Sequence, residues 1–478
     1  MSQVDKKNKL IPNDWASTKL DCVVNIVRGV TYKKDQASDF FVEGYLPVIR
    51  ANNIQNDKLI LSDFVYVDAN IIKCTQKIKK NDIVVAMSSG SKSVVGKTAK
   101  AESDLDAAFG AFCGLLRPSS LIIPEVIGFY TRSAYYRNKV SELSAGANIN
   151  NLKPAHFGEL DFPLPPLAEQ KEIADQLDTL LAQVEATQAH LARIPDIIKQ
   201  YRQSVLAAAV SGKLTDEWRK SNNVALSSWI FDSAKNLCDK VQSGSTPKDN
   251  PFEKNGKIPF LKVYNIVNQR IDFDYKPQFV TSEVHSQKLK RSVALPDDVL
   301  MNIVGPPLGK VALLTNQYPE WNINQAITLF RTGNKKLLAK FLYFVLCEGC
   351  LVREVLHDVK GIVGQVNISL SQCREAVIPC PSLKEQTEIV RRVEQLFAYA
   401  DSIEQQAKAA KERVDNLTQA ILAKAFRGEL TSDWRAANPD LISGDNSAAA
   451  LLARIQAERV TASGKKGKCG TSKSRTTA

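Results

Sequence analysis

Pro163-Leu164-Pro165-Pro166-Leu167-Ala168-Glu169-Gln170-Lys171-Glu172-Ile173 returns later in the chain as Pro379-Cys380-Pro381-Ser382-Leu383-Lys384-Glu385-Gln386-Thr387-Glu388-Ile389. The two copies are offset by 216 positions, from Glu169 to Glu385. The match continues without a gap through Gly212-Lys213-Leu214-Thr215 and Gly428-Glu429-Leu430-Thr431, and it ends at Trp218-Arg219 and Trp434-Arg435. A period this long is not a solenoid repeat, so the sequence indicates that a whole module is duplicated.

The segments between these copies match more loosely. Residues 46–54 resemble residues 258–266, and Gly96-Lys97 corresponds to Gly309-Lys310. The chain is therefore expected to alternate variable and shared parts. The expected divisions are a first variable half at 1–162, a first shared helical segment at 163–220, a second variable half at 221–378, a second shared helical segment at 379–435 and a C-terminal extension at 436–478.

Both shared segments carry apolar residues at alternating steps of four and three, which is the pattern of a coiled-coil seam. The expected seam consists of Ile173, Leu177, Leu180, Val184, Leu191, Ile198, Ile389, Val393, Leu396, Ile403, Val414, Leu417 and Ile421. Each helix of about 40 residues would span about 60 Å at 1.5 Å per residue. We expect the two helices to pair antiparallel; the alternative is that each helix packs only on its own half of the chain.

The two variable halves are predicted to have a mixed α/β fold. Short β-rich runs such as residues 82–87 and 311–314 alternate with turns of Gly, Ser and Asn. Helices are expected late in each half, around 125–143 and 336–355, and a short helix is expected at 447–460. The basic tail at 464–475 is expected to be disordered.

Loops in both halves place basic and amide side chains beside glycine. Lys and Arg neutralise phosphates, whereas Arg, Asn and Gln can pair with base edges. Solvated surface loops look the same, but two such sets at corresponding places in a duplicated chain favour DNA contact. The candidate DNA-binding residues are Arg28, Tyr32, Lys33, Lys34, Arg50, Asn52, Asn53, Ser89, Lys92, Lys97, Asn148, Lys248, Lys262, Asn265, Lys310, Asn324, Gln325, Lys360 and Gln365.

Composition agrees with a polyanionic partner. Lys and Arg number 63 against 51 Asp and Glu, giving a net charge of +12 and a pI near 9.1. An anionic membrane is the competing partner, but no apolar run approaches 18 residues and no secretory segment opens the sequence. We therefore expect a cytoplasmic protein whose nine cysteines are mostly small buried hydrophobes. Cys347 and Cys350, with His357 and Cys373, have a zinc-like spacing, but a core helix is the simpler interpretation.

No catalytic motif is found, so the sequence predicts a non-catalytic protein without a metal or cofactor of its own. Residues 90–98 resemble a phosphate-binding loop, but five residues rather than four separate Gly90 from Gly96. Nuclease, adenine methyltransferase and hydrolase signatures are also missing. Two alternatives stay open: a free-standing sequence-specific DNA-binding regulator, and an enzyme whose motifs are unrecognised.

The paired Pro-Leu-x-Glu-Gln helix openings and the Gly-x-Leu-Thr…Trp-Arg endings resemble the specificity subunits of type I restriction-modification enzymes. Residues 388–401, 424–431 and 28–33 look like the K-type (IA) family. The resemblance implies two target-recognition domains, each reading one half of a bipartite asymmetric DNA sequence. The helices would set the spacing and dock two methyltransferase subunits. These would bind S-adenosylmethionine and flip an adenine, and two restriction/translocase subunits would use ATP and magnesium.

Overall fold

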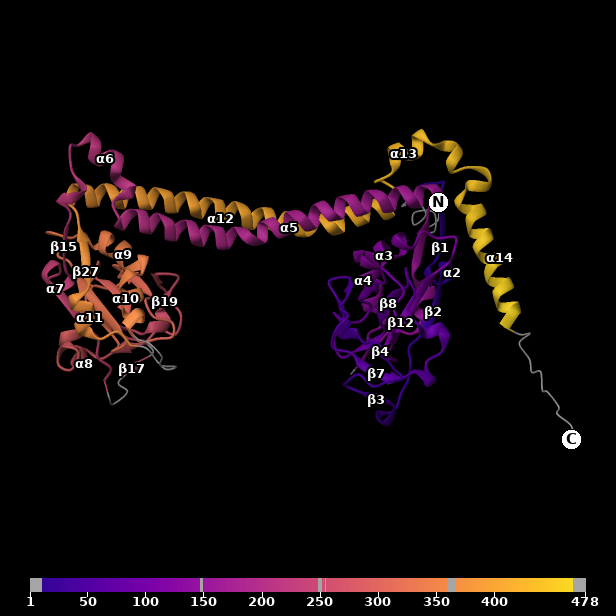
Figure 1. Ribbon diagram of the computed structural model, residues 1–478, viewed down its shortest axis with the longest axis horizontal. Coiled ribbons are helices and arrows are strands. Elements are labelled where there is room, and N and C mark those ends of the chain that lie inside the picture. The colour runs from indigo at the N-terminus through magenta and orange to yellow at the C-terminus, as the bar shows by residue number, and fades with distance from the viewer. Residues whose placement is uncertain (1–10, 147–148, 248–251, 254, 359–366, 467–478) are drawn as a thin grey trace. The chain divides into compact units, whose positions relative to one another are not determined.

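The computed structural model describes residues 11–146, 149–247, 252–253, 255–358 and 367–466. The chain divides into two compact units: unit 1 comprises residues 1–190 with 410–478, and unit 2 comprises residues 191–409. Each unit contains one variable half together with one end of each long helix (Figure 1). Four of the candidate residues (Asn148, Lys248, Lys360 and Gln365) lie outside the described residues.

Unit 1 is built on two four-stranded sheets. The antiparallel sheet has the order β10-β8-β12-β2, and the mixed sheet has the order β11-β4-β7-β3, in which β11 and β4 are parallel. The strands are β2 (Val24–Arg28), β3 (Ala37–Ser38), β4 (Tyr45–Ile49), β7 (Val65–Asp68), β8 (Ile83–Ala86), β10 (Thr98–Lys100), β11 (Ala108–Phe109) and β12 (Cys113–Pro118). Two-stranded ribbons pair β1 (Ala16–Lys19) with β14 (Asp161–Leu164), β5 (Ile54–Gln55) with β6 (Lys58–Leu59), and β9 (Ser88–Ser89) with β13 (Asn150–Asn151).

Unit 2 repeats this arrangement. Its antiparallel sheet has the order β16-β26-β23-β24, and a five-stranded sheet has the order β17-β21-β18-β25-β22. The strands are β16 (Lys240–Ser243), β17 (Phe252–Glu253), β18 (Ile258–Leu261), β21 (Phe279–Val280), β22 (Val293–Ala294), β23 (Val299–Asn302), β24 (Val311–Leu313), β25 (Trp321–Ile323) and β26 (Ile327–Arg331). Ribbons pair β15 (Ile230–Ser233) with β27 (Val377–Cys380) and β19 (Ile266–Val267) with β20 (Arg270–Ile271).

Short helices cover these sheets. The helices expected late in each half are confirmed, but each is broken in two: α3 and α4 meet at Ser133, which caps α4, and α9 and α10 meet at Gly349, whose φ is +89°. The bounds are α2 (Leu20–Val23), α3 (Pro124–Arg132), α4 (Ala134–Leu143), α7 (Ala234–Leu237), α8 (Ser282–Ser286), α9 (Ala339–Glu348), α10 (Cys350–Asp358) and α11 (Leu370–Glu375). The apolar face of α3 packs onto the antiparallel sheet through Val126, Ile127 and Tyr130.

One ion pair recurs in the two antiparallel sheets. Arg117 on β12 donates to both carboxylate oxygens of Asp82, at 2.7 and 2.6 Å. Arg331 on β26 donates to Asp298 in the same way, at 2.8 and 2.7 Å. Both aspartates are buried, so each needs a partner, and the planar guanidinium matches a carboxylate at both oxygens. The mixed α/β prediction is confirmed in both halves.

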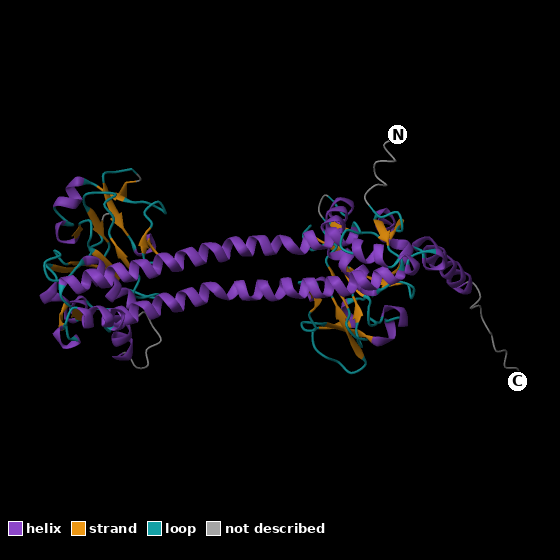
Figure 2. Cartoon of the chain, turned by 90° about the horizontal axis from the view of Figure 1, so that it is seen from above, coloured by secondary structure: helices purple, strands orange, loops and turns teal. Residues whose placement is uncertain are grey.

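The shared segments form two helices of 44 residues, α5 (Leu167–Val210) and α12 (Leu383–Phe426). In unit 1 the beginning of α5 packs beside the end of α12, where Leu177 and Leu422 share one buried cluster, and Gln188 in the middle of α5 donates to Asp415 at 2.9 Å. In unit 2 the end of α5 packs beside the beginning of α12, where Arg202 contacts Asp401 and Glu404. Within each unit the two helices therefore run antiparallel, as expected (Figure 2).

The buried face of the long helices follows much of the expected seam. Ile173, Leu177, Val184, Ile198, Ile389 and Val393 are buried, and Leu180, Leu191, Leu396, Ile403, Val414 and Ile421 are half-buried. The assignment of Leu417 to the seam is wrong, because its side chain is 45% exposed. A straight helix drifts from a seven-residue repeat by about 20° per heptad. Near its end α12 accordingly buries Leu422 and Ala425, against Trp15.

Short helices follow both long ones: α6 (Asp216–Ser221) after α5, and α13 (Ser432–Ala437) and α14 (Ala448–Lys466) after α12. The short helix expected at 447–460 is confirmed as part of α14. Leu451 and Ile455 of α14 join the core of unit 1, and the helix lies beside β1 and α2 (Figure 1). No helix among the described residues combines the length and the apolar character that crossing a membrane requires.

Candidate DNA interface

Four loop segments meet at one end of the sheets in unit 1. Val30 N donates to Phe109 O at 2.7 Å, which places residues 28–34 beside the turn at 110–112. Met87 N and Ser88 N both donate to Phe112 O, at 2.8 and 3.2 Å, which fastens residues 88–93 to the same turn. Leu152 N then donates to Met87 O at 2.7 Å. Two of the loops that carry candidate residues, at 28–34 and 88–93, are thereby brought together.

A glycine permits the closest of these approaches. A Cβ on Gly29 would lie 2.0 Å from Gly110 O, and a Cβ on Gly244 of unit 2 would lie 2.1 Å from Asn324 O. Atoms cannot approach so closely, so both positions require glycine for close backbone contact. These glycines occupy the same place in the two units.

Unit 2 repeats three of these four hydrogen bonds. Ser245 N donates to Ile323 O at 3.1 Å, Ile303 N to Ala326 O at 2.8 Å, and Ile368 N to Ile303 O at 2.8 Å. Residues 243–247, 303–310, 324–326 and 367–368 are therefore the counterparts of the unit 1 loops. The two loop sets share one scaffold although their side chains differ.

The loops at residues 50–53 and 262–265 follow β4 and β18 toward the same end of the sheets. Ile49 O accepts from Gly110 N at 2.9 Å, and Leu261 O accepts from Asn324 N at 3.0 Å. These bonds tie both loops to the turns described above.

Two expected DNA contacts do not fit this geometry. Asn53 and Asn265 are buried, and their amide groups are used internally. Asn53 accepts from Arg50 N and donates to Ile60 O and Ser62 O; Asn265 accepts from Lys262 N and donates to Asp272 O and Tyr275 O. Each amide holds its loop in shape and turns no hydrogen-bonding group to solvent. We therefore withdraw both as candidate base contacts.

The cations of the unit 1 loops face solvent. Arg28, Lys33, Lys34, Lys92 and Lys97 are exposed, and Ser89 and Tyr32 are half-buried. Arg50 and Asn52 both contact Asp63, so DNA would compete with a carboxylate for them. Among the described residues of the unit 2 loops, Lys262 lies over the ring of Phe252, 4.7 Å from its centroid, and Lys310 and Asn324 are half-buried. Gln325 is exposed.

The segment that resembled a phosphate-binding loop is a tight turn against a helix. Gly96 has a φ of +75°, and a Cβ there would lie 2.3 Å from Val140 of α4. Gly309 has the same φ, and its Cβ would lie 2.6 Å from Val352 of α10. Arg137 donates to the carbonyls of Ser93 and Val95, which fixes the turn and leaves Lys97 exposed.

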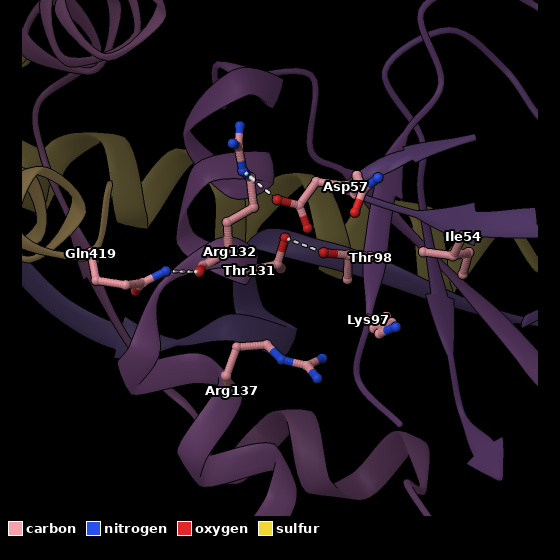
Figure 3. A pocket seen from close by; sticks show the side chains of 9 residues that line it. Ile54, Asp57, Lys97, Thr98, Thr131, Arg132, Arg137 and Gln419 are labelled. Carbon is pink, nitrogen blue, oxygen red and sulfur yellow. Dashed lines mark hydrogen bonds and ion pairs between the residues drawn. The ribbon is translucent and has the colours of Figure 1, made fainter. Parts of the chain in front are cut away.

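A polar pocket of about 350 Å³ lies next to this turn in unit 1 (Figure 3). The Arg132 guanidinium lies 2.9 Å from Asp57, Thr98 donates to Thr131 at 3.0 Å, and Gln419 of α12 donates to Arg132 O at 3.1 Å. No His or Cys lines the pocket. Across the described residues, no three His, Cys, Asp or Glu side chains are grouped to hold a metal. The hydrogen bond from Gln419 to Arg132 O joins the recognition domain of unit 1 to α12.

The chain matches the family described as the type I restriction modification DNA specificity domain twice, at residues 12–196 and 227–412. The chain belongs to this family. It is 45% identical, over 95% of its length and 98% of the relative, to the type I restriction enzyme EcoKI specificity subunit of Escherichia coli K12. It is also 45% identical, over the same shares, to the StySPI specificity subunit of Salmonella potsdam. The expected K-type resemblance is thereby confirmed.

Solved structures agree on the fold. A chain from a structure of the assembly and conformational transition of a type I restriction-modification system matches with a TM-score of 0.64, at 18% identity, over 88% of this chain and 99% of that one. The HsdS subunit of Thermoanaerobacter tengcongensis matches with a TM-score of 0.59 at 18% identity, over 88% and 98%.

The repeated Glu-Gln pair of this specificity subunit has a structural role that the sequence did not reveal. Glu169 is fully buried and accepts from Trp15 Nε1 at 2.8 Å, Thr431 Oγ1 at 2.6 Å and Arg435 Nη2 at 2.8 Å. In unit 2, Glu385 accepts equivalent bonds from the side chains of Trp229, Thr215 and Arg219. The beginning of one long helix is thus joined to the segment that follows the other.

The neighbouring glutamine attaches the recognition domain. Gln170 accepts from Ile123 N at 3.0 Å and donates to Pro165 O, and Gln386 accepts from Leu338 N at 2.8 Å and donates to Pro381 O. Ile123 and Leu338 directly precede α3 and α9, so each glutamine fixes a helix of the recognition domain to the first turn of a long helix. The Glu-Gln motif therefore fixes each recognition domain, and with it the loops that the domain carries, to a long helix.

Proposed function

We propose that each unit of this DNA specificity subunit reads one half of a bipartite asymmetric target. The observation that carries the proposal is the convergence of the same four loops in both units, on one scaffold and with different side chains. A duplicated scaffold with different loops suits two different half-sites, because base edges are read by side chains whereas the backbone only places them.

The basic loops of unit 1 supply phosphate contacts as well as base contacts. Arg28, Lys33, Lys34, Lys92 and Lys97 provide exposed cations, which neutralise phosphates without regard to sequence. In unit 2 the exposed amide of Gln325 and the side chain of Asn324 are candidates for direct readout, since amides can pair with adenine.

We propose that the long helices set the spacing between the half-sites and dock two methyltransferase subunits. The two continuous helices of 44 residues support the spacing role, because a helix fixes length at 1.5 Å per residue. Those partners would carry S-adenosylmethionine, and two restriction/translocase subunits would use ATP and magnesium. This chain would be the non-catalytic component on which both methylation and restriction depend.

Single-molecule methylation mapping tests the proposal. The chain would be co-expressed with its cognate methyltransferase subunit, and cells carrying the partner alone would serve as the control. Adenine methylation at one asymmetric two-part sequence is the expected result. Methylation no greater than in the control, with the complex shown to be intact, would contradict it and favour a free-standing DNA-binding regulator.

A further inference from the structure

Phe112 of unit 1 is an exposed phenylalanine on a rigid turn. Its side chain is 70% exposed, whereas its carbonyl accepts two backbone hydrogen bonds, from Met87 N and Ser88 N. The same turn is held by Cys113 N, which donates to Gly110 O at 2.8 Å. The backbone therefore presents the ring to solvent in one place. Transfer of a phenyl ring out of water is favourable, so an exposed ring at a fixed place is suited to a partner that buries it.

The surroundings of Phe112 favour a polyanion as that partner. The converging segments of unit 1 are residues 28–36, 88–97, 110–113 and 149–153. Their charged residues are Arg28, Lys33, Lys34, Asp35, Lys92, Lys97 and Lys153. Interfaces between proteins are depleted in lysine at their centre, whereas DNA interfaces are rich in it. A second apolar side chain, Ile149, is 59% exposed and directly precedes the strand that pairs with Ser89.

Unit 2 has a different residue at this position. Ala326 is the counterpart of Phe112, because its carbonyl accepts from Ile303 N as that of Phe112 accepts from Met87 N. The scaffold is therefore stable without a phenyl ring at this position, and the ring is not needed to build the turn. A side chain that is present in one unit and lacking in the other has the distribution expected of a residue that distinguishes one half-site.

We propose that Phe112 is a DNA-contacting residue whose ring packs against the bases of the half-site read by unit 1. The proposal rests on the proposed function and adds an apolar contact to it. DNA offers an apolar surface to a phenyl ring at the 5-methyl group of thymine and at the face of an unstacked base. Either contact discriminates between sequences, because only thymine carries the methyl group and steps differ in how easily they unstack.

The test compares Phe112→Ala with Phe40→Ala, which removes a phenylalanine that is 80% exposed elsewhere in unit 1. Each variant is assembled with the methyltransferase subunit, and its affinity for a duplex carrying the mapped target and for a scrambled duplex is measured by fluorescence anisotropy. Phe112→Ala should weaken target binding five- to a hundredfold, leave the scrambled duplex unaffected, and relax methylation specificity in one half-site only. Phe40→Ala should match the wild type.

Substituted duplexes distinguish the two apolar surfaces. If the ring contacts a methyl group, replacing the thymines of the half-site by uracil one at a time should lower the DNA affinity of the wild-type complex at one position. The same replacements should not lower the DNA affinity of the Phe112→Ala complex at any position. If no uracil duplex weakens the wild type, enhanced fluorescence of 2-aminopurine in the wild-type complex alone would indicate an unstacked base.

Two outcomes would overturn the assignment of Phe112. Wild-type affinity and specificity in an intact Phe112→Ala complex would mean that the ring contacts no DNA. Loss of subunit assembly in that variant would mean that the ring is a protein contact. Failure of the proposed function is distinct, because the wild-type complex would then lack a two-part target altogether.

Discussion

Arg219 Nη1 donates to Glu385 Oε1 at 2.7 Å, and this bond joins the segment that follows α5 to the first turn of α12. Both side chains are buried, with exposed fractions of 5% for Arg219 and 0% for Glu385. The corresponding bond in unit 1 joins Arg435 to Glu169. Each unit thus contains a buried carboxylate that holds the two long helices together, and each carboxylate also accepts from a tryptophan of the recognition domain.

Removing Arg219 should be strongly destabilising. Arg219→Ala leaves the Glu385 carboxylate buried without its charged partner, which costs about 3–5 kcal/mol of unfolding free energy. Arg427→Ala is the matched control, because Arg427 pairs with Glu429 at the surface, and exposed pairs contribute about 0–1 kcal/mol. Thermal melting of both variants would check this. Equal melting temperatures for the two variants would show that the buried ion pair contributes no more to stability than the exposed one.

The assignment of the buried helix face can be tested with two leucines of unit 1. Leu177 is fully buried against Leu422 and Ala425, whereas Leu417 is 45% exposed although the apolar pattern places both residues on the expected seam. Leu177→Ala should cost about 2–5 kcal/mol, and Leu417→Ala should stay within about 1 kcal/mol of the wild type. Urea denaturation monitored by circular dichroism measures both. A loss of unfolding free energy as large for Leu417→Ala as for Leu177→Ala would show that the buried face follows the strict heptad pattern.

These two residues also show how far the sequence predicts the structure. The apolar period predicts two long helices, because burial of one face repeats along the chain. It does not predict where the buried face leaves the heptad, since that depends on which domain residues the helix meets. Glu385 and Arg219 lie 166 positions apart, so no local pattern reveals their bond. Asn53 looks like a base-contacting residue in the sequence, because its hydrogen bonds to the carbonyls of Ile60 and Ser62 cannot be inferred from composition.

Phe112 escaped prediction for a related reason. It lies in the run Ala107-Ala108-Phe109-Gly110-Ala111-Phe112-Cys113, whose composition is that of a buried strand. Phe109 is indeed fully buried, and the turn between β11 and β12 exposes Phe112 three positions later. The backbone decides which phenylalanine faces solvent.

Acid should weaken one surface cluster on α12. Hydrogen bonds from Arg391 and then Arg392 lower the pKa of Glu388 to about 2, below its usual value of 4.5. The stabilisation is present above pH 4.5 and is lost as the pH falls through the folded-state value. Because Arg391 is half exposed, Glu388→Gln should cost no more than about 1 kcal/mol at pH 7. Thermal melting of the wild type and Glu388→Gln from pH 7 to pH 2 should show that the difference between their melting temperatures shrinks below pH 4.5. A difference that stays constant over this range would show that the Glu388 carboxylate is not its source.

The turn at Gly96 should tolerate no side chain. Alanine there must adopt a φ of +75° with its Cβ 2.3 Å from Val140, so Gly96→Ala should destabilise unit 1 by about 1 kcal/mol or more and displace Lys97. Gly90→Ala is the control, because nothing lies within 4 Å of a Cβ at Gly90. Thermal melting of the two variants would decide the matter. Equal effects would mean that the turn is free to adjust.

The exposed cations of unit 1 should act through phosphates. A protein that neutralises a phosphate releases counterions, so the logarithm of its binding constant falls with the logarithm of salt concentration by about 0.9 per phosphate contact. Arg28→Ala and Lys34→Ala should each reduce the slope by about one and weaken target and scrambled duplexes alike. Lys220→Ala is the control, since Lys220 is exposed on α6, which contributes to none of the converging loops, and pairs with Asp216. Anisotropy titrations between about 50 and 200 mM salt give the slope. An unchanged slope in both loop variants would remove these residues from the phosphate interface, whereas a loss confined to the target duplex would make them base contacts instead.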